Sequence, residues 1–384
     1  MPQDKTLEII AFKGTEELSD FIRVPFEVYK DDPNWIPQLT FERKEHFSLR
    51  SNPYFAHAQV CFFVAYRGGK PVGRITAQID NQEETCATIG HFGCLEATDE
   101  ETLQALLEEA EAWLAQKKIK EVTGPYSLSI NDEVGLLVDG FHSPPRLMMN
   151  YAPTWYAGAT ESCGYSKAKD LYAYTFDMSK EIPDRSRKMA AYALDKQNIY
   201  ERPINMNNLK QELQVIMDIF NDAWADNWGF TPMTKAEIAY MAKNLRPILN
   251  PKMARILYVD DKPAGMIVGL PDINEALEGL GGQLLPFGWF KLLWRLKVKG
   301  LRGSRVMLMG VRKEYQGTRL GGAMTAALIT RLYDIGKQQG FERMELSWIL
   351  EENEAMRKFI NFVGGDYDKT YRVFRKSLGQ KKER

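Results

Sequence analysis

The sequence predicts a layered α+β protein of two tandem domains, each with a mixed, mostly antiparallel β-sheet flanked by helices. Three observations support this fold class. A hairpin-like pattern occurs once in each half, the strand and helix signals around it keep the same order, and a glycine-rich turn in the second half joins a strand to a helix. The chain has 384 residues, enough for two or three domains of ordinary size.

The repeated pattern consists of an apolar run, a polar turn and a second apolar run. Residues 66–75 read YRGGKPVGRI, and residues 258–267, half the chain length further on, read YVDDKPAGMI. Such a pattern is typical of a β-hairpin. Because both copies follow a helical segment and precede a strand, a helix and another strand, we interpret the chain as an internal repeat.

In addition to the hairpin, the first half contains signals for four strands and two helices. We expect strands at 7–11, 87–93, from 122 onward and at 171–177, and helices at 15–29 and 100–116. The first helix begins with Thr15, in an order that resembles a capping box. These elements form a predicted N-terminal domain over residues 1–180.

The second half repeats this order after a charged segment. Residues 181–206 are expected to form a linker with a short helix at 186–197. The predicted C-terminal domain covers residues 207–378, with helices at 209–225 and 323–337 and strands at 306–310 and 344–349 around the hairpin. Residues 379–384 form a polar tail.

Composition excludes several classes of protein. Lys and Arg number 50 and Asp and Glu 51, so the basic excess of a nucleic-acid binder is missing. The four cysteines show no C-x-x-C spacing and no histidines at zinc-finger spacing, which favours free thiols and no metal. The polar N-terminus and the absence of a long apolar run predict a cytoplasmic protein.

The glycine-rich turn indicates an anion site. Gly317, Gly321 and Gly322 follow an apolar strand and open a helix, so that backbone N–H groups there are not covered by side chains. The helix dipole adds partial positive charge at the same place. Together these properties suit a phosphate or pyrophosphate.

The turn and its surroundings resemble the GNAT superfamily of acyl-CoA-dependent N-acyltransferases, whose pyrophosphate loop reads Gln/Arg-x-x-Gly-x-Gly/Ala. Gln316, Gly317 and Gly321 match this loop, whereas Arg319 stands where the family usually has its middle glycine. Downstream, Asn353 and Gly364 fall where the family has its Asn-x-x-Ala motif and its final turn. Ile360 occupies the usual Tyr position, and the Gly-Phe turn reads Gly-Gly.

The resemblance implies an N-acyltransferase that uses acyl-CoA, acetyl-CoA by default, as co-substrate for a primary amine. By the same resemblance, the backbone of Met309, Gly310 and Val311 would hold the thioester carbonyl. The pyrophosphate would lie on Gln316, Gly317, Thr318, Arg319, Leu320, Gly321 and Gly322, and Asn353 would contact the pantetheine arm. Two alternatives stay open: Arg319 either meets a phosphate or obstructs the loop, and Asn353 also suits a helix N-cap.

Groups for proton transfer are less evident. Ile360 cannot protonate a leaving thiolate, so Tyr367 is a candidate replacement for the family's acid. In the first half, Asp132 and Glu133 lie in a polar loop after a strand, where either could act as general base or bind the amine. The alternative is a local turn and helix cap.

The two halves are not equivalent in their turns. The first half has Thr98, Asp99, Glu100 and Glu101 where the second has its glycines. These residues suit a helix N-terminus but repel a pyrophosphate. We therefore expect the first domain to be degenerate and to shape a substrate cleft instead of binding CoA.

Residues 284–299 combine Phe and Trp with spaced Lys and Arg and contain no acid. Such a segment predicts peripheral contact with the inner membrane face, or an apolar lid over a long chain. The alternative is a helix packed on the neighbouring domain. The lipid-facing interpretation makes a lipid amine and a long-chain acyl donor candidates beside a small-molecule amine, and an acyl carrier protein could present the same pantetheine arm. A non-catalytic binding or interaction protein that kept the fold is the rival from another class.

Overall fold

The computed structural model describes residues 6–14 and 17–379, and its chain divides into two compact units. Unit 1 comprises Met1–Leu171, Leu277–Gly288 and Lys369–Arg384, and unit 2 comprises Tyr172–Ala276 and Trp289–Asp368. The last strand of the chain therefore contributes mainly to the first unit. Compact units and sequence repeats are different divisions of a chain, so the domain ranges 1–180 and 207–378 stay a prediction.

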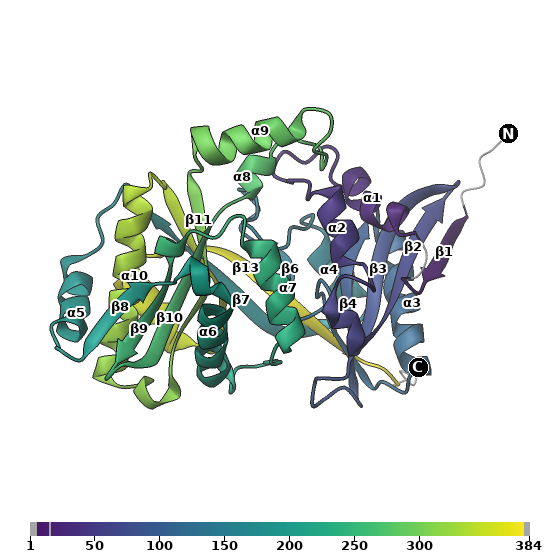
Figure 1. Ribbon diagram of the computed structural model, residues 1–384. Helices are drawn as coiled ribbons and strands as arrows, with labels where there is room; N and C mark the ends of the chain where they lie inside the picture. Colours follow the sequence, from purple (N-terminus) through teal and green to yellow (C-terminus); the bar gives the residue numbers. More distant parts are fainter. Residues whose placement is uncertain (1–5, 15–16, 380–384) are drawn as a thin grey trace. The chain divides into compact units, whose positions relative to one another are not determined.

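Unit 1 is built on strands in the order β1-β2-β3-β4-β5-β13 (Figure 1). Its elements are β1 (Leu7–Phe12), α1 (Ser19–Val28), α2 (Thr40–His46), β2 (Ala58–Arg67), β3 (Lys70–Asp80), β4 (Ile89–Ala97), α3 (Glu100–Gln116), β5 (Glu121–Gly124), β6 (Leu136–Asp139), α4 (Tyr156–Ser162) and the larger part of β13 (Asp366–Ser377). The strands β1 to β4 pair antiparallel, and β4 pairs parallel with β5.

Unit 2 contains the strand order β8-β9-β10-β11-β12. Its elements are the end of β7 (Ser166–Asp177), α5 (Asp184–Leu194), β8 (Ile199–Pro203), α6 (Leu209–Trp224), α7 (Lys235–Leu245), β9 (Ala254–Val259), β10 (Lys262–Pro271), most of α8 (Asn274–Leu277), α9 (Gly288–Trp294), β11 (Gly303–Val311), α10 (Arg319–Gln338), β12 (Arg343–Leu350) and α11 (Glu354–Phe362). Strands β8 to β11 pair antiparallel, and β11 pairs parallel with β12.

The internal repeat is visible in the strand pairing. In both units four antiparallel strands are followed by a helix and a parallel strand, and the hairpins share one register. Tyr66 pairs with Pro71 in unit 1, and Tyr258 pairs with Pro263 in unit 2. Each hairpin also has a register irregularity beside this pair. The predicted layered fold of two tandem repeats is confirmed.

Several element bounds differ from expectation. Helix α1 begins at Ser19, and its expected start at Thr15 lies outside the described residues. Strand β4 continues to Ala97, through part of the expected turn. Helix α10 begins at Arg319, four residues early, because the hydroxyl of Thr318 accepts a hydrogen bond from the Gly321 N–H and caps the helix there.

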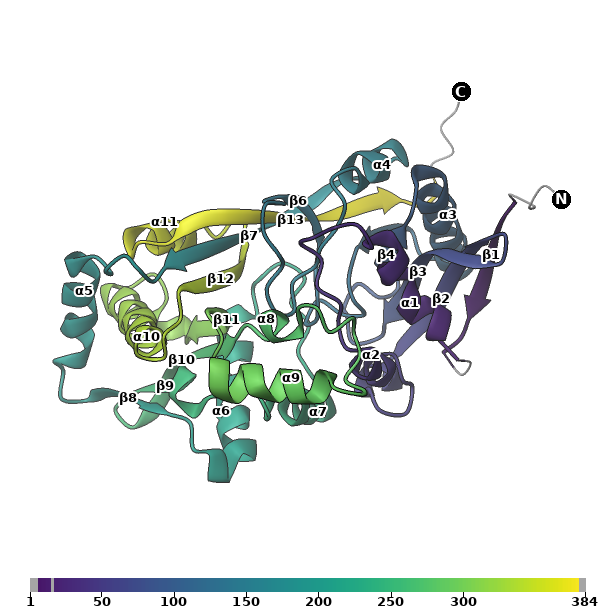
Figure 2. The same ribbon diagram turned by 90° about the horizontal axis from the view of Figure 1, so that it is seen from above.

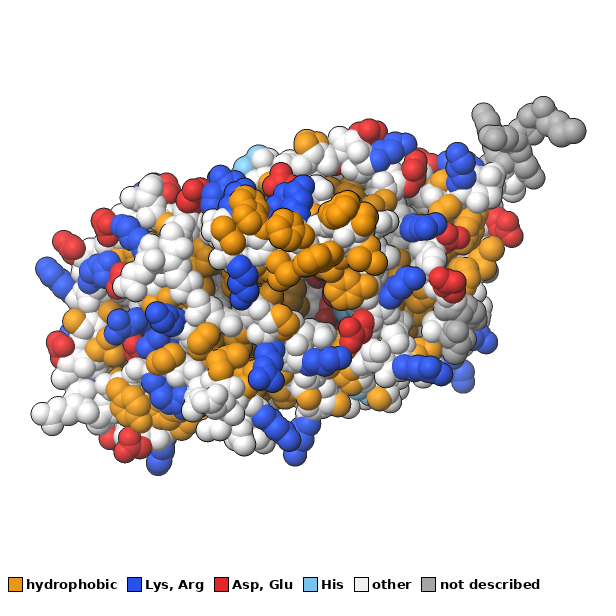
Figure 3. All heavy atoms as spheres, turned by 45° about the horizontal axis from the view of Figure 1, so that its top comes forward, with side chains coloured by type: hydrophobic (Ala, Val, Ile, Leu, Met, Phe, Trp, Pro, Cys, Tyr) orange, Lys and Arg blue, Asp and Glu red, His pale blue; other side chains and the backbone are white. Residues whose placement is uncertain are grey.

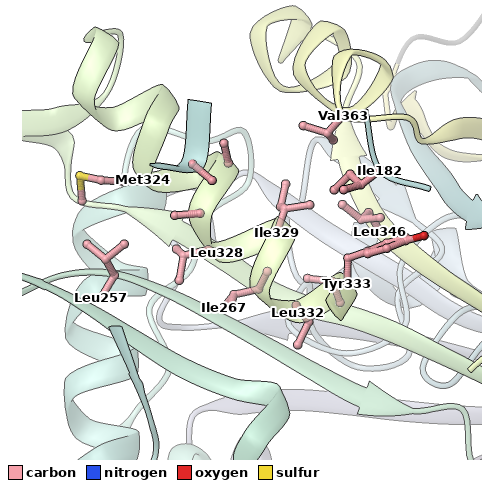
Figure 4. Packing of buried hydrophobic residues seen from close by; sticks show 14 of the residues in the cluster. Ile182, Leu257, Ile267, Met324, Leu328, Ile329, Leu332, Tyr333, Leu346 and Val363 are labelled. Atoms are coloured by element: carbon pink, nitrogen blue, oxygen red, sulfur yellow. The ribbon is translucent and has the colours of Figure 1, made fainter. Parts of the chain in front are cut away.

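Both faces of the sheet in unit 2 are covered. Ile267 on β10 packs with α10 residues such as Leu328 and Leu332, as Figure 4 shows, while its neighbours Met266 and Val268 belong to the cluster under α6. Successive side chains of a strand point to opposite faces, so a strand covered twice is apolar throughout. Figure 2 shows α10 and α6 on either side of these strands.

Candidate active site

A pocket in unit 2 opens where two parallel strands separate. The ladder between β11 and β12 runs from Gly303 opposite Arg343 to Val306 opposite Leu346. Beyond that point, within the described chain, β11 keeps its pairing with β10 alone. Part of the β11 backbone after Val306 therefore faces an opening in the sheet.

The pocket has a volume of about 480 Å³ and is lined by residues of unit 2 alone. Its lining includes nine of the eleven residues predicted to bind the co-substrate: Met309, Gly310, Val311, Gln316, Gly317, Thr318, Gly321, Gly322 and Asn353. The sequence reasoning missed lining residues from α6 and the turn after it, namely Ala223, Trp224 and Asn227, and from β12, namely Leu346, Ser347, Trp348, Ile349 and Leu350. The structure thus brings together in one pocket the strand, loop and helix positions that the family resemblance implied.

The glycine-rich loop forms one wall of this pocket. A Cβ on Gly321 would lie 2.0 Å from the carbonyl oxygen of Tyr315, so no larger residue fits without moving the backbone. Gly317 has φ +70° and open space around its Cα. In the described chain, the N–H groups of Gly317, Arg319 and Leu320 have no backbone or side-chain acceptor. These three donors at the start of a 20-residue helix can receive an anion.

Side chains from α6 and the loop fix the end of β11. The amide of Gln316 donates to the carbonyls of Val311 (2.9 Å) and Ala223 (3.1 Å). The indole N–H of Trp224 donates to the carbonyl of Met309 at 3.1 Å. The N–H and C=O of one strand residue point to the same side, so the Met309 N–H faces the same opening as its carbonyl. Gln316 therefore supports the loop through its side chain, and Trp224 orients the strand.

Arg319 and Leu320 do not line the pocket. The guanidinium of Arg319 lies over the ring of Tyr192, 4.4 Å from its centroid. Stacked in this way, the side chain neither reaches into the pocket nor blocks the loop. Neither of the two predicted roles, contact with a phosphate or obstruction of the loop, describes this arrangement. The backbone N–H groups of both residues still belong to the helix start.

Asn353 is the N-cap residue of α11 and also lies at the pocket wall. Its side-chain oxygen accepts a hydrogen bond from the Met356 N–H at 3.1 Å and caps α11. The same residue lines the pocket. A cap of this kind stabilises a helix by about 1 kcal/mol, and here it also fixes a polar side chain at the pocket wall.

None of the described lining residues carries an ionisable side chain. Ile360 is fully buried in the core of unit 2. It packs so closely against Gly365 that a Cβ added to that glycine would lie 2.6 Å from the Ile360 side chain. Tyr367 is 46% exposed, stacks edge-on with Tyr172 and Tyr174, and is not among the lining residues. The structure therefore does not bring the predicted acid to the pocket.

A buried charged cluster reaches the pocket through Ser347. The Ser347 hydroxyl donates to a carboxylate oxygen of Glu345 at 2.5 Å and accepts from the Nε of Arg305 at 2.8 Å. Arg305 and Glu345 are 5% and 1% exposed, and only Ser347 lines the pocket. Nothing in the sequence indicated this cluster, because Arg305 and Glu345 belong to two different strands.

Asp132 and Glu133 lie in unit 1. Asp132 accepts a hydrogen bond from the Ser129 hydroxyl at 3.0 Å, which matches the local-turn alternative, and burial raises its pKa. Glu133 accepts from the Gln38 amide at 2.5 Å and lies 3.6 Å from the guanidinium of Arg43. Both carboxylates are thus held by neighbours of their own unit, and their roles toward a substrate stay predictions.

A second buried carboxylate of unit 1 escaped the sequence reasoning. Glu96 on β4 accepts a hydrogen bond from the hydroxyl of Tyr29 and lies 3.7 Å from Arg74. Burial raises the pKa of Glu96 to about 7, although Arg74 and the Tyr29 hydroxyl favour its charged form. At the start of α3, Asp99 caps the helix by accepting from the Thr102 N–H at 2.8 Å, as expected for this turn.

Two curated relatives match this chain over nearly its whole length. Bacterial ceramide synthase of Caulobacter vibrioides (strain NA1000 / CB15N) is 42% identical over 385 residues, which cover 98% of this chain and 100% of the relative. Protein YghO of Escherichia coli (strain K12) is 42% identical over 378 residues, which cover 96% and 94%. No protein-family model matches the sequence.

Among solved structures, a tandem GNAT protein from the clavulanic acid biosynthesis pathway has the same fold. Its TM-score is 0.57 at 12% identity, with 97% of this chain and 99% of that chain covered. The repeated strand pairing and the glycine loop at the start of α10 agree with this similarity. The chain has the fold of tandem GNAT proteins and belongs to the family that includes bacterial ceramide synthase and protein YghO.

Proposed function

We propose that this enzyme transfers a long-chain acyl group from CoA to the primary amine of a long-chain amino alcohol. The observation that carries this proposal is a single pocket that joins the strand opening to the uncovered N–H groups of the glycine loop. The acceptor class follows from the relative named ceramide synthase, because a ceramide is a long-chain amino alcohol acylated on nitrogen. That relationship favours the enzyme over a non-catalytic binding protein.

The residues of the pocket suit the two ends of such a donor. The N–H groups of Gly317, Arg319 and Leu320 would receive the pyrophosphate, and the N–H of Met309 would donate to the thioester oxygen. The amine nitrogen forms a bond to the thioester carbon, the C–S bond breaks, and CoA leaves as a thiolate. The proton lost by the amine balances the one that the thiolate takes up.

Ser347 is our candidate for positioning that amine. Ser347 lines the pocket, and its hydroxyl donates a hydrogen bond to the buried carboxylate of Glu345. A proton can pass from an amine to Glu345 along this bond if the hydroxyl shifts its own proton at the same time. The departing thiolate needs no acid from the pocket, since an unperturbed thiol has a pKa of about 8.5.

The assay that tests the function uses the purified full chain with one donor and one amine at a time. The donors are palmitoyl-CoA, acetyl-CoA and a palmitoylated acyl carrier protein, and the amines are sphinganine and spermidine. We expect palmitoyl-CoA and sphinganine to give an amide, detected by mass spectrometry, with one free thiol released per amide. Acetylation of spermidine without acylation of sphinganine would overturn the proposed substrate class.

Arg319→Ala should change the affinity for palmitoyl-CoA by less than about threefold. The guanidinium rests on Tyr192, and its loss leaves the backbone donors of the loop in place. Isothermal titration calorimetry measures this affinity directly. A loss of tenfold or more would show that the side chain turns to meet a phosphate when the donor binds.

Ser347→Ala should lower kcat by about 10- to 100-fold and leave the KM for palmitoyl-CoA nearly unchanged, as expected for a group that assists proton transfer. Ser347→Thr keeps the hydroxyl and is the matched control. Equal losses in both variants, or a large rise in KM, would assign Ser347 to packing instead.

A further inference from the structure

Residues 285–298 expose most of the large hydrophobic side chains on the described surface. Seven of thirteen such side chains lie there, and the other six are scattered over the rest of the chain. The seven are Leu285 (78% exposed), Phe287 (78%), Trp289 (47%), Phe290 (63%), Leu293 (48%), Trp294 (46%) and Val298 (72%). Concentration of this kind marks a binding surface, whereas single exposed hydrophobic residues are ordinary.

The exposed apolar side chains of α9 occupy one side of the helix. Trp289, Phe290, Leu293 and Trp294 follow the spacing i, i+1, i+4 and i+5, which places them within a single face at 100° per residue. A π-helical turn, Arg295–Lys299, continues the run. Figure 3 looks onto this side of the molecule and shows hydrophobic side chains gathered there with Lys and Arg among them.

Unit 2 holds this helix in place at its C-terminal end. A guanidinium nitrogen of Arg295 donates to the carbonyl of Ala276 at 2.8 Å, and the N–H of Arg302 donates to Glu275 at 2.7 Å. The polar contacts are therefore directed inward and the aromatic rings outward. A helix that is anchored with its apolar side in water needs a partner for that side.

The charged residues of the segment 285–299 itself are all Lys or Arg. No Asp or Glu occurs between Gly279 and Lys313. Lys291, Lys297 and Lys299 are exposed, and none of them forms an ion pair within the described chain. An anionic surface would complement these three cations, whereas an apolar protein groove would leave them unmatched.

We propose that residues 285–299 dock this enzyme on the surface of an anionic lipid bilayer. The Trp and Phe rings would enter the region between headgroups and acyl chains, where Trp is enriched, and the lysines would contact anionic headgroups. No helix of the described chain is long and apolar enough to cross a bilayer, so the segment lies in the interface. This inference does not depend on the proposed substrate, because it concerns binding of the protein to a lipid surface and not the acyl-transfer reaction.

Sedimentation with lipid vesicles tests the proposal without substrate. The full chain is mixed with vesicles of phosphatidylcholine alone or with 30% phosphatidylglycerol, at low and high salt, and the bound fraction is measured. We expect binding to the anionic vesicles that weakens at high salt. Trp289→Ser with Phe290→Ser should reduce the partition coefficient at least about tenfold, since two aromatic anchors are lost.

A second variant separates charge from apolar contact. Lys291→Gln, Lys297→Gln and Lys299→Gln together should reduce binding to anionic vesicles by about fivefold for each lysine removed. The matched controls change exposed residues elsewhere: Phe41→Ser for the aromatic variant, and Lys70→Gln, Lys210→Gln and Lys235→Gln for the charge variant.

Two outcomes would overturn the proposal. One is wild-type protein that stays in the supernatant with anionic vesicles, or segment variants that bind as well as their controls. The other is a wild-type dimer in size-exclusion chromatography with light scattering that Trp289→Ser with Phe290→Ser converts to monomer, because the apolar face would then cover a second copy of the chain.

Discussion

Gly321→Ala should weaken the binding of palmitoyl-CoA by at least about 100-fold. The added methyl group would lie 2.0 Å from the carbonyl oxygen of Tyr315, a backbone atom that can move only with the loop. Such a shift displaces the uncovered N–H groups of Gly317 and Leu320, which precede Gly321 in the loop and the first turn of α10. Each hydrogen bond to a charged group contributes about 1.5–3 kcal/mol, so the loss of two gives the stated factor.

Gly322→Ala is a close control for this experiment. Its Cβ would meet the end of the flexible Met189 side chain at 2.8 Å, which can move away without displacing the loop. Calorimetric titration should therefore show near-normal affinity for this variant, while both proteins keep similar melting temperatures without ligand. Equal affinities for the two variants would mean that the loop does not receive the pyrophosphate.

The second large effect concerns the stability of unit 1. Burial raises the pKa of Glu96 to about 7 from its ordinary value of 4.5, so the folded protein holds this proton more tightly than the unfolded chain. The resulting stabilisation is fully present below pH 4.5 and is lost as the pH rises through about 7. The difference between these pKa values corresponds to roughly 3 kcal/mol in the free energy of unfolding.

Glu96→Gln removes this titration and keeps an oxygen for the hydroxyl of Tyr29. Relative to the variant, the wild type should therefore become less stable by roughly 3 kcal/mol between pH 4.5 and pH 8. Urea unfolding of both proteins at these pH values measures the change, with Glu109→Gln as an exposed control. Parallel pH profiles for wild type and Glu96→Gln would show that folding leaves the pKa of this carboxyl group unchanged.

The local features of this chain could be predicted from its sequence. The hairpin at Tyr258 and Pro263 and the helix over Glu100–Gln116 depend on turn residues, periodicity and capping groups close together in the chain. The helix after the glycine loop was also predicted, although it begins four residues earlier than expected, at Arg319. The resemblance of the glycine loop and its surroundings to the GNAT family also predicted nine of the pocket-lining residues.

The rest of the pocket depends on residues far apart in sequence. Trp224 lies 85 residues from the Met309 carbonyl that it binds, and Arg305 lies 42 residues from Ser347. No local pattern distinguishes such residues from ordinary buried side chains. Tyr367 is the opposite case. It lies near the position of the family's acidic Tyr in the sequence, but it contacts Tyr172 and is not among the residues that line the pocket.

Sequence alone determined the repeat, the glycine-rich turn between a strand and a helix, and the acid-free aromatic segment at 284–299, because each is a pattern of neighbouring residues. Tertiary structure decided that β11 and β12 part after Val306 and Leu346, that Trp224 orients the exposed strand, and that Ser347 connects the pocket to Glu345. It also decided that the rings of Trp289 and Phe290 face outward. These features depend on long-range packing and strand pairing, which no short stretch of the chain encodes.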